Sequence, residues 1–193
     1  MQSNRQKMTS QSHPLHIDGI KMLGSWGMLG ITFCPGKKDA HSYSGVWDRD
    51  LDADLDLIQA WPAAAVVTLI EPHEFELLEV EGLGEGVMQR GMRWYQLPIR
   101  DVSVPDAQFE RQWEAAGKEL FQILKQGDSI VVHCRGGLGR AGLVVARLLI
   151  ETGFPADKAI RGVRAARPGA IETKEQENYL LRLPTAPWLS ARL

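Results

Sequence analysis

The segment from Ile130 to Gly142 constrains the fold more than any other part of the chain. It begins with a run of β-branched residues typical of a buried strand, continues through a glycine-rich loop and leads into a helix. Cys134 ends the strand, and Arg140 opens the helix after five intervening residues. A strand that passes through a short loop into a helix is a unit of layered α/β domains.

Other segments continue this alternation. Apolar runs predict strands over 66–70, 93–99 and 129–133, and 16–35 is compatible with two more. Apolar residues at three- and four-residue spacing, with Pro or Thr at the start and Gly at the end, predict helices over 50–61, 105–126, 140–152, 155–167 and from 173. The first sixteen residues are polar and are expected to form a flexible tail. The pattern predicts one α/β layered domain with a largely parallel sheet.

Composition excludes several classes of protein. With 193 residues, 44% hydrophobic and 24% charged, the chain has the make-up of a folded domain rather than a disordered one. Two cysteines exclude a disulfide-rich scaffold. The polar N-terminus lacks the apolar core of a signal peptide, and Arg147 interrupts the longest apolar stretch, 143–150. We therefore expect no membrane association and a cytoplasmic location.

The net charge of −2 hides an uneven distribution. Eleven acidic residues and one basic residue lie within 48–86, whereas seven basic and three acidic residues lie within 127–170. The acidic run at 48, 50, 52, 54 and 56 would scatter around a helix, so a solvated face is favoured over a chelating site. The basic segment indicates either a solvated face or an anion site, and we expect no nucleic-acid partner.

The loop that follows Cys134 suits a phosphate group. Its glycines allow backbone N–H groups to point inward, and the helix N-terminus adds positive partial charge. A cysteine held there is expected to be a thiolate, and the planar guanidinium of Arg140 can bind two phosphate oxygens. We therefore predict Cys134 as a nucleophile and a substrate cradle made of Arg135, Gly136, Gly137, Leu138, Gly139 and Arg140. The alternative is a structural turn with an inert buried cysteine.

Two other loop chemistries fit poorly. No Gly-Lys-Ser/Thr closes the segment, as a mononucleotide-binding loop would require. No second Cys/His pair lies at zinc-ligand spacing. We predict neither a metal nor a cofactor.

The motif His133-Cys134 followed by five residues and Arg140 resembles the signature of the cysteine-dependent protein tyrosine phosphatase superfamily. The residue sequence of this loop resembles that of the dual-specificity members. Residues 97–106 are similar to that family's general-acid loop, and 169–179 to the segment after its active-site helices. The resemblance implies an α/β three-layer protein-tyrosine-phosphatase-like fold, with a central, mostly parallel sheet flanked by helices. It covers 17–183, leaving tails at 1–16 and 184–193.

The resemblance also implies an aspartate as general acid, and two candidates exist. Asp101 follows a predicted strand, at the kind of position where catalytic groups lie, and matches the family position. Asp106 opens a long helix, where the helix dipole alone explains an acidic side chain. We favour Asp101 and keep Asp106 as the alternative.

Three further residues bear on the mechanism. The resemblance implies that His133 helps to fix the loop and the thiolate. Gln176 either positions water or completes a capping box with Thr173. The family places Ser or Thr after the loop arginine, where this chain has Ala141. That hydroxyl is thought to stabilise the departing thiolate, and losing such a bond costs about 1.5–3 kcal/mol, a slowdown of about ten- to a hundredfold.

The predicted function is a phosphatase that hydrolyses a phosphorylated protein or a small phosphomonoester through a phosphocysteine intermediate. One alternative, suggested by Ala141, is a phosphoprotein-binding module with slow turnover. A second is an inositol-phosphate phosphatase, because Arg135 adds positive charge at the rim. A third is a sulfurtransferase with a persulfidable Cys134, which the spacing to Arg140 and the upstream Asp101 disfavour. The sequence does not indicate which oligomeric state the protein adopts.

Overall fold

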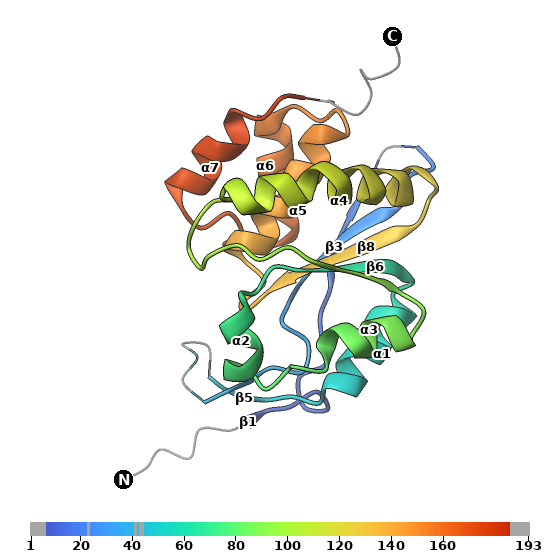
Figure 1. Ribbon diagram of the computed structural model, residues 1–193, viewed down its shortest axis with the longest axis vertical. Coiled ribbons are helices and arrows are strands. Elements are labelled where there is room, and N and C mark those ends of the chain that lie inside the picture. The colour runs from blue at the N-terminus through green and yellow to red at the C-terminus, as the bar shows by residue number, and fades with distance from the viewer. Residues whose placement is uncertain (1–6, 23, 41, 43–44, 186–193) are drawn as a thin grey trace.

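The computed structural model describes residues 7–22, 24–40, 42 and 45–185. A five-stranded sheet lies at its centre in the order β2-β3-β8-β6-β7 (Figure 1). Its strands are β2 (Asp18–Lys21), β3 (Met28–Phe33), β8 (Ser129–Cys134), β6 (Ala63–Thr68) and β7 (Arg93–Gln96). β2 pairs antiparallel with β3, and the other pairs are parallel. The predicted mostly parallel sheet is confirmed.

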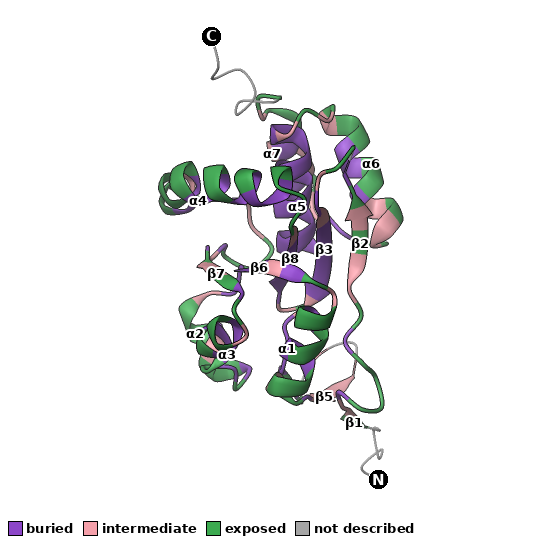
Figure 2. Ribbon diagram, turned by 90° about the vertical axis from the view of Figure 1, so that its right-hand side faces the viewer, coloured by how far each residue is buried: buried purple, intermediate pink, exposed green. Residues whose placement is uncertain are grey.

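Helices cover both faces of this sheet (Figure 2). One face carries α4 (Ala107–Lys125), α5 (Gly139–Glu151), α6 (Ala156–Ala166) and α7 (Lys174–Leu181). The other face carries α1 (Leu51–Ala60) and α3 (Leu83–Gln89), with the short α2 (Pro72–Leu77) nearby. A separate core cluster of buried apolar side chains lies on each face. The result is the predicted three-layer arrangement.

The strand β8 lies in the middle of the sheet because it is apolar on both faces. Val131 and Val132 are fully buried in opposite core clusters. Such double burial is typical of central parallel strands. Since all four parallel strands point the same way, Cys134 at the end of β8 emerges beside the ends of β3 and β6. In open α/β sheets this edge is where ligands bind.

A second sheet involves the N-terminal segment. It has three strands in the order β1 (Lys7–Met8), β5 (Val46–Asp48), β4 (Lys38–Asp39). Residues 7–16, expected as a flexible tail, are instead packed against the domain: Ser10 accepts a hydrogen bond from the Asp50 backbone N–H, and Leu15 is buried. Residues 1–6 and 186–193 of the two expected tails lie outside the described residues.

The acidic run of α1 does not form a single solvated face, which corrects the sequence interpretation. Asp54 is fully buried, where both its oxygens accept hydrogen bonds from Arg49 at 2.7 Å. Asp50 caps the helix, and the exposed Asp52 and Asp56 bind Arg90. A buried guanidinium compensates the buried carboxylate, and spacing along one helix does not reveal that partner.

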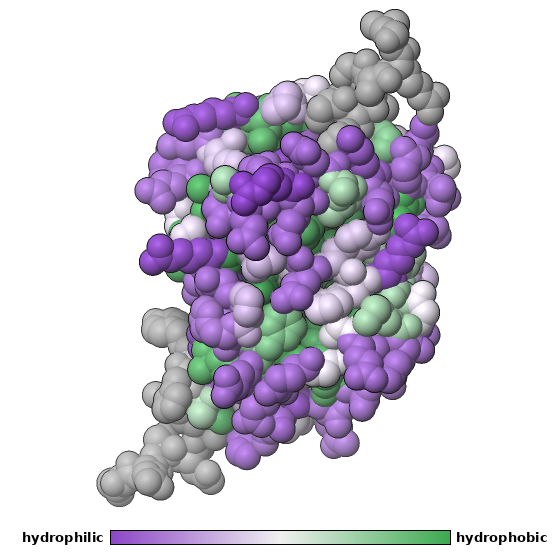
Figure 3. Space-filling view, in the orientation of Figure 1, coloured by the Kyte–Doolittle hydropathy of each residue, from purple (hydrophilic) through white to green (hydrophobic). Residues whose placement is uncertain are grey.

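None of the described helices is both long and apolar enough to cross a membrane. Hydrophilic side chains cover most of the face in Figure 3, and apolar ones are exposed there only in small areas.

Candidate active site

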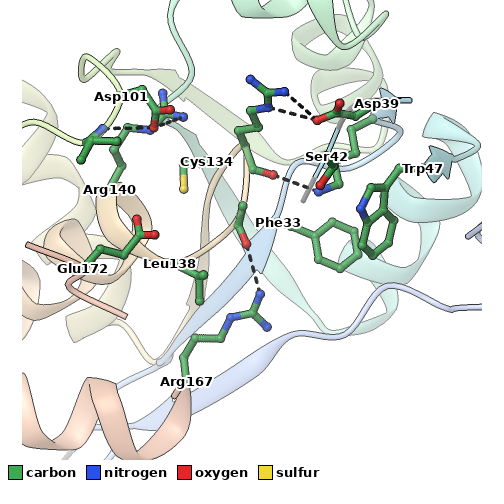
Figure 4. Close-up of a pocket in the computed structure, with 14 residues that line it drawn as sticks. Phe33, Asp39, Ser42, Trp47, Asp101, Cys134, Leu138, Arg140, Arg167 and Glu172 are labelled. Atoms are coloured by element: carbon green, nitrogen blue, oxygen red, sulfur yellow. Dashed lines mark hydrogen bonds and ion pairs between the residues drawn. The ribbon is translucent and has the colours of Figure 1, made fainter. Parts of the chain in front are cut away.

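A cavity of about 660 Å³ opens where β3 and β8 end. Cys134 lies in it among side chains from five separate parts of the chain (Figure 4). Its lining comprises Phe33, Lys37, Asp39, Ser42, Trp47, Asp101, Val102, Cys134, Arg135, Gly136, Leu138, Arg140, Arg167 and Glu172. The fold therefore brings the predicted nucleophile, arginine and acid to one place. Gly137 and Gly139 belong to the same loop without lining the cavity.

The loop curls around the sulfur of Cys134. The Gly137 N–H donates a hydrogen bond to Sγ over 3.2 Å, and α5 begins at Gly139 with its N-terminus toward the loop. Gly137 has φ +69°, and a side chain there would lie 2.5 Å from the Thr32 carbonyl oxygen. Only glycine satisfies both the positive φ and the close approach. The arrangement is a nest for an anion.

Arg140 is held rigidly beside this nest. Its guanidinium is 2% exposed and donates to both oxygens of Glu74, at 2.6 and 3.0 Å, and to the Ile99 carbonyl at 3.2 Å. Burial opposes the charge of Glu74, but the hydrogen bonds and charge of Arg140 hold the pKa of this carboxyl below its usual range. The pair fixes the guanidinium plane before any ligand arrives.

The structure separates the two candidate acids. Asp101 lines the cavity, with its side chain 57% exposed and Oδ1 3.0 Å from an Arg140 nitrogen. Asp106 is the N-cap of α4, where its carboxylate accepts the Phe109 N–H at 2.8 Å. This cap explains why the helix begins after Asp106 rather than at Pro105. Val102, next to Asp101, has φ +57°, a strained backbone for a β-branched residue.

His133 lies behind the loop and is fully buried. Burial lowers its pKa to about 3, so the ring is neutral at physiological pH. Its Nε2 is 2.8 Å from the Thr68 hydroxyl, which also accepts a hydrogen bond from Trp94. The imidazole is therefore tied to the sheet and does not line the cavity.

Both ends of the Gln176 amide group form hydrogen bonds within the protein. Its amide oxygen accepts the N–H groups of Glu172 at 2.9 Å and Thr173 at 3.4 Å, which completes the predicted capping box. Its amide nitrogen donates to the Ser103 carbonyl at 3.1 Å and so attaches the Asp101 loop to α7. The adjacent Glu172 carries a carboxylate into the cavity.

The side of the cavity away from Asp101 is aromatic and charged (Figure 4). The rings of Phe33 and Trp47 lie 5.0 Å apart, and the Lys37 ammonium packs against both. Burial lowers the pKa of Lys37 to about 8. Arg135, predicted as a rim charge, donates twice to Asp39, at 2.8 and 3.1 Å. Its charge is therefore largely balanced within the protein.

Among the described residues, no group of three or more His, Cys, Asp or Glu side chains is arranged to hold a metal ion. Cys34 lies in the core, where burial raises the pKa of its thiol.

Several residues of this site were not found from the sequence, among them Glu74, Arg167, Glu172 and Lys37. Glu74 and Lys37 lie far from the loop in the chain, and their partners depend on how α2 and β4 pack. Arg167 lies in the basic segment, where it could not be told from helix-coating arginines.

Comparisons with known proteins identify phosphatase relatives. A family model described as "PTP-SAK: Swiss Army Knife protein, DSP-PTPase phosphatase domain" matches residues 53–180. Cyclin-dependent kinase inhibitor 3 of Rattus norvegicus is 32% identical over 197 residues, covering 98% of this chain and 89% of that protein. Protein tyrosine phosphatase type IVA 3 of Homo sapiens is 37% identical over 78 residues, 40% of this chain and 44% of that protein.

Solved structures show the same fold. Kinase associated phosphatase (KAP), with its catalytic site cysteine substituted by serine, superposes with a TM-score of 0.74 at 27% identity, covering 86% of this chain and 92% of that one. The active form of Tk-PTP gives a TM-score of 0.61 at 26% identity, covering 84% and 100%.

Fold and relatives together define a cysteine-dependent phosphatase, a phosphoric monoester hydrolase of the protein tyrosine phosphatase class. Within this class, the chain belongs to the dual-specificity phosphatase domain family. The predicted three-layer fold is confirmed, and so is the resemblance to the dual-specificity members of the superfamily.

Proposed function

We propose that this phosphatase acts through Cys134, with Arg140 and the loop N–H groups as the phosphate cradle and Asp101 as the general acid. The observation that carries the proposal is the Cys134 sulfur held by a loop N–H at a helix N-terminus, in one cavity with Arg140 and Asp101. The cavity thus joins the three groups that phosphoryl transfer requires: a nucleophile, an anion cradle and an acid.

The first step transfers the phosphoryl group to the enzyme. A phosphate oxygen takes the place of the Asp101 carboxylate on Arg140, where the two side chains now lie 3.0 Å apart. The Cys134 thiolate attacks phosphorus, the ester P–O bond breaks, and protonated Asp101 gives its proton to the leaving oxygen. The product is a phosphocysteine and a free alcohol or phenol.

The second step hydrolyses the phosphocysteine. Water attacks phosphorus, Asp101 takes up its proton, and the S–P bond breaks to release inorganic phosphate and the thiolate. Ala141 is buried in the first turn of α5 and offers no hydroxyl to the departing sulfur. This step is therefore the slow one.

The substrate class we propose is a phosphorylated protein side chain. A cavity of about 660 Å³ holds far more than a phosphate group. Its aromatic side, Phe33 and Trp47, supplies apolar contact for the atoms that carry the phosphate. The phosphatase unit is proposed to span 17–183 and to work in a reducing compartment such as the cytoplasm, because a thiolate nucleophile must stay reduced.

Hydrolysis of a small aryl phosphate in the presence of a chelator tests the proposal. We expect steady turnover by the wild type and a loss of at least about a thousandfold in Cys134→Ser, because the serine hydroxyl ionises far less readily than a thiol. Cys34→Ser, which changes the other cysteine, should keep turnover. Full activity in Cys134→Ser would refute the assignment.

A phosphopeptide panel with an inositol phosphate then defines the substrate. Preference for phosphopeptides supports the proposed class, whereas preference for the inositol phosphate would overturn it.

A further inference from the structure

Arg167, at the end of α6, lines the cavity and binds backbone carbonyls of the phosphate loop. Its Nε donates to the Gly137 carbonyl at 3.0 Å, and one terminal nitrogen lies 3.4 Å from the Gly136 carbonyl. The other terminal nitrogen donates to Asp18 of β2 at 2.7 Å. Figure 4 shows the guanidinium reaching up to the loop from below Leu138.

The two carbonyls belong to the peptide units that build the cradle. In a planar trans peptide the C=O and N–H groups point to opposite sides. The unit with the Gly136 carbonyl contains the Gly137 N–H, which donates to the Cys134 sulfur. The unit with the Gly137 carbonyl contains the N–H of Leu138, a residue that lines the cavity. Fixing both carbonyls outward therefore turns both N–H groups inward.

The ion pair between Arg167 and Asp18 is largely shielded from solvent. The side chains of Arg167 and Asp18 are 17% and 16% exposed, so solvent screens the pair only partly. A positive charge on the carbonyl side also polarises each peptide and strengthens its N–H as a donor. Asp18 lies 149 residues before Arg167, outside the signature segment and outside the part matched by the family model.

We propose that Arg167 is a positioning residue that orients and polarises two peptide units of the phosphate loop, and that Asp18 holds it in place. Arg167 acts through the loop, on the charge of Cys134 and on the affinity for a phosphate group. The proposal deepens the function proposed above and rests on it.

Alkylation of Cys134 by neutral iodoacetamide, followed by mass spectrometry, measures the first effect. In Arg167→Ala the rate at pH 6 should fall about tenfold, because the sulfur loses support for its negative charge, while at pH 10 it should stay nearly unchanged. The inhibition constant of inorganic phosphate should rise about tenfold. Arg167→Lys keeps the charge but not the forked guanidinium, so both changes should be smaller than in Arg167→Ala.

Arg161→Ala is the matched control. It removes the same charge from the same helix, but this side chain is 69% exposed and forms an ion pair with Asp157 one turn away. Asp18→Asn keeps the shape of the anchor and should weaken phosphate inhibition by about threefold.

The results separate this inference from the proposed function. If the wild type hydrolyses the aryl phosphate and Arg167→Ala behaves like Arg161→Ala in both measurements, the inference is wrong while the function stands. A wild type without Cys134-dependent turnover refutes the function itself. If Arg167→Ala does not fold, Arg167→Lys and Asp18→Asn decide, and wild-type values in both would overturn the inference.

Discussion

At the scale of single residues, the site consists of a loop that can be recognised from the sequence and of tertiary partners that cannot. Cys134 and Arg140 stand out because their spacing is fixed by the geometry of one continuous loop. Glu74 cannot be found in that way, since nothing in its own segment indicates that α2 will bring it to within 2.6 Å of Arg140. Local spacing predicts contacts within a loop or helix, whereas buried ion pairs depend on tertiary packing.

Ala141 gives the first residue-scale prediction. In a rapid-mixing experiment with an excess of aryl phosphate, the wild type should show a burst of released phenol followed by slow turnover. Ala141→Ser should speed the slow phase by about ten- to a hundredfold, because a hydroxyl stabilises the departing thiolate by about 1.5–3 kcal/mol. The amplitude of the burst counts active sites and serves as the internal control. An unchanged slow phase would contradict the role given to the missing hydroxyl.

At the scale of elements, the sequence located most helices and the central strands correctly but missed the short ones. α4 was predictable because its apolar spacing, the preceding proline and Gly127 (φ +93°) after its end all agree. α2 and β4 have six and two residues and owe their form to their surroundings. Short elements carry too little periodicity to be recognised.

The loop from Asp101 to the start of α4 permits a paired test of the two aspartates. Asp101→Asn should reduce turnover of an alkyl phosphate by about a hundredfold or more, because an alcohol leaves poorly without a proton. Asp106→Ala should leave turnover nearly unchanged but lower the free energy of unfolding by about 1 kcal/mol, because the N-cap of α4 is lost.

Turnover and urea denaturation, measured on both variants, decide between the assignments. The reverse pattern, with activity lost in Asp106→Ala and kept in Asp101→Asn, would transfer the acid to Asp106.

At the scale of the whole molecule, burial of a neutral histidine in the central strand makes stability depend on pH. The pKa of His133 is about 3 in the folded protein, against an ordinary value of 6.5. Below pH 6.5 the His133 imidazole therefore binds a proton in the unfolded chain but not in the folded protein, and the free energy of unfolding falls. Carboxyls with a lowered pKa, such as Glu74, contribute only near and below their ordinary value of 4.5.

Urea denaturation at pH 7 and pH 5.5 isolates this effect. The free energy of unfolding should fall by about 1 kcal/mol over the interval on account of His133. His133→Asn should be less stable at pH 7, and its free energy of unfolding should not show the decrease between pH 7 and pH 5.5 that is due to His133. If the variant shows the same decrease as the wild type, another group is responsible for the pH dependence.

The position of β3 has a consequence for how the enzyme can be divided. The family model begins at residue 53, yet β3 pairs with β8 from Leu29 with Ile130 to Phe33 with Cys134. A fragment cut at that boundary would turn the central strand into a bare apolar edge, the kind of surface on which chains aggregate. The segment before the matched region is thus what keeps the strand that carries Cys134 closed to other chains, and any shortened form of this phosphatase must retain it.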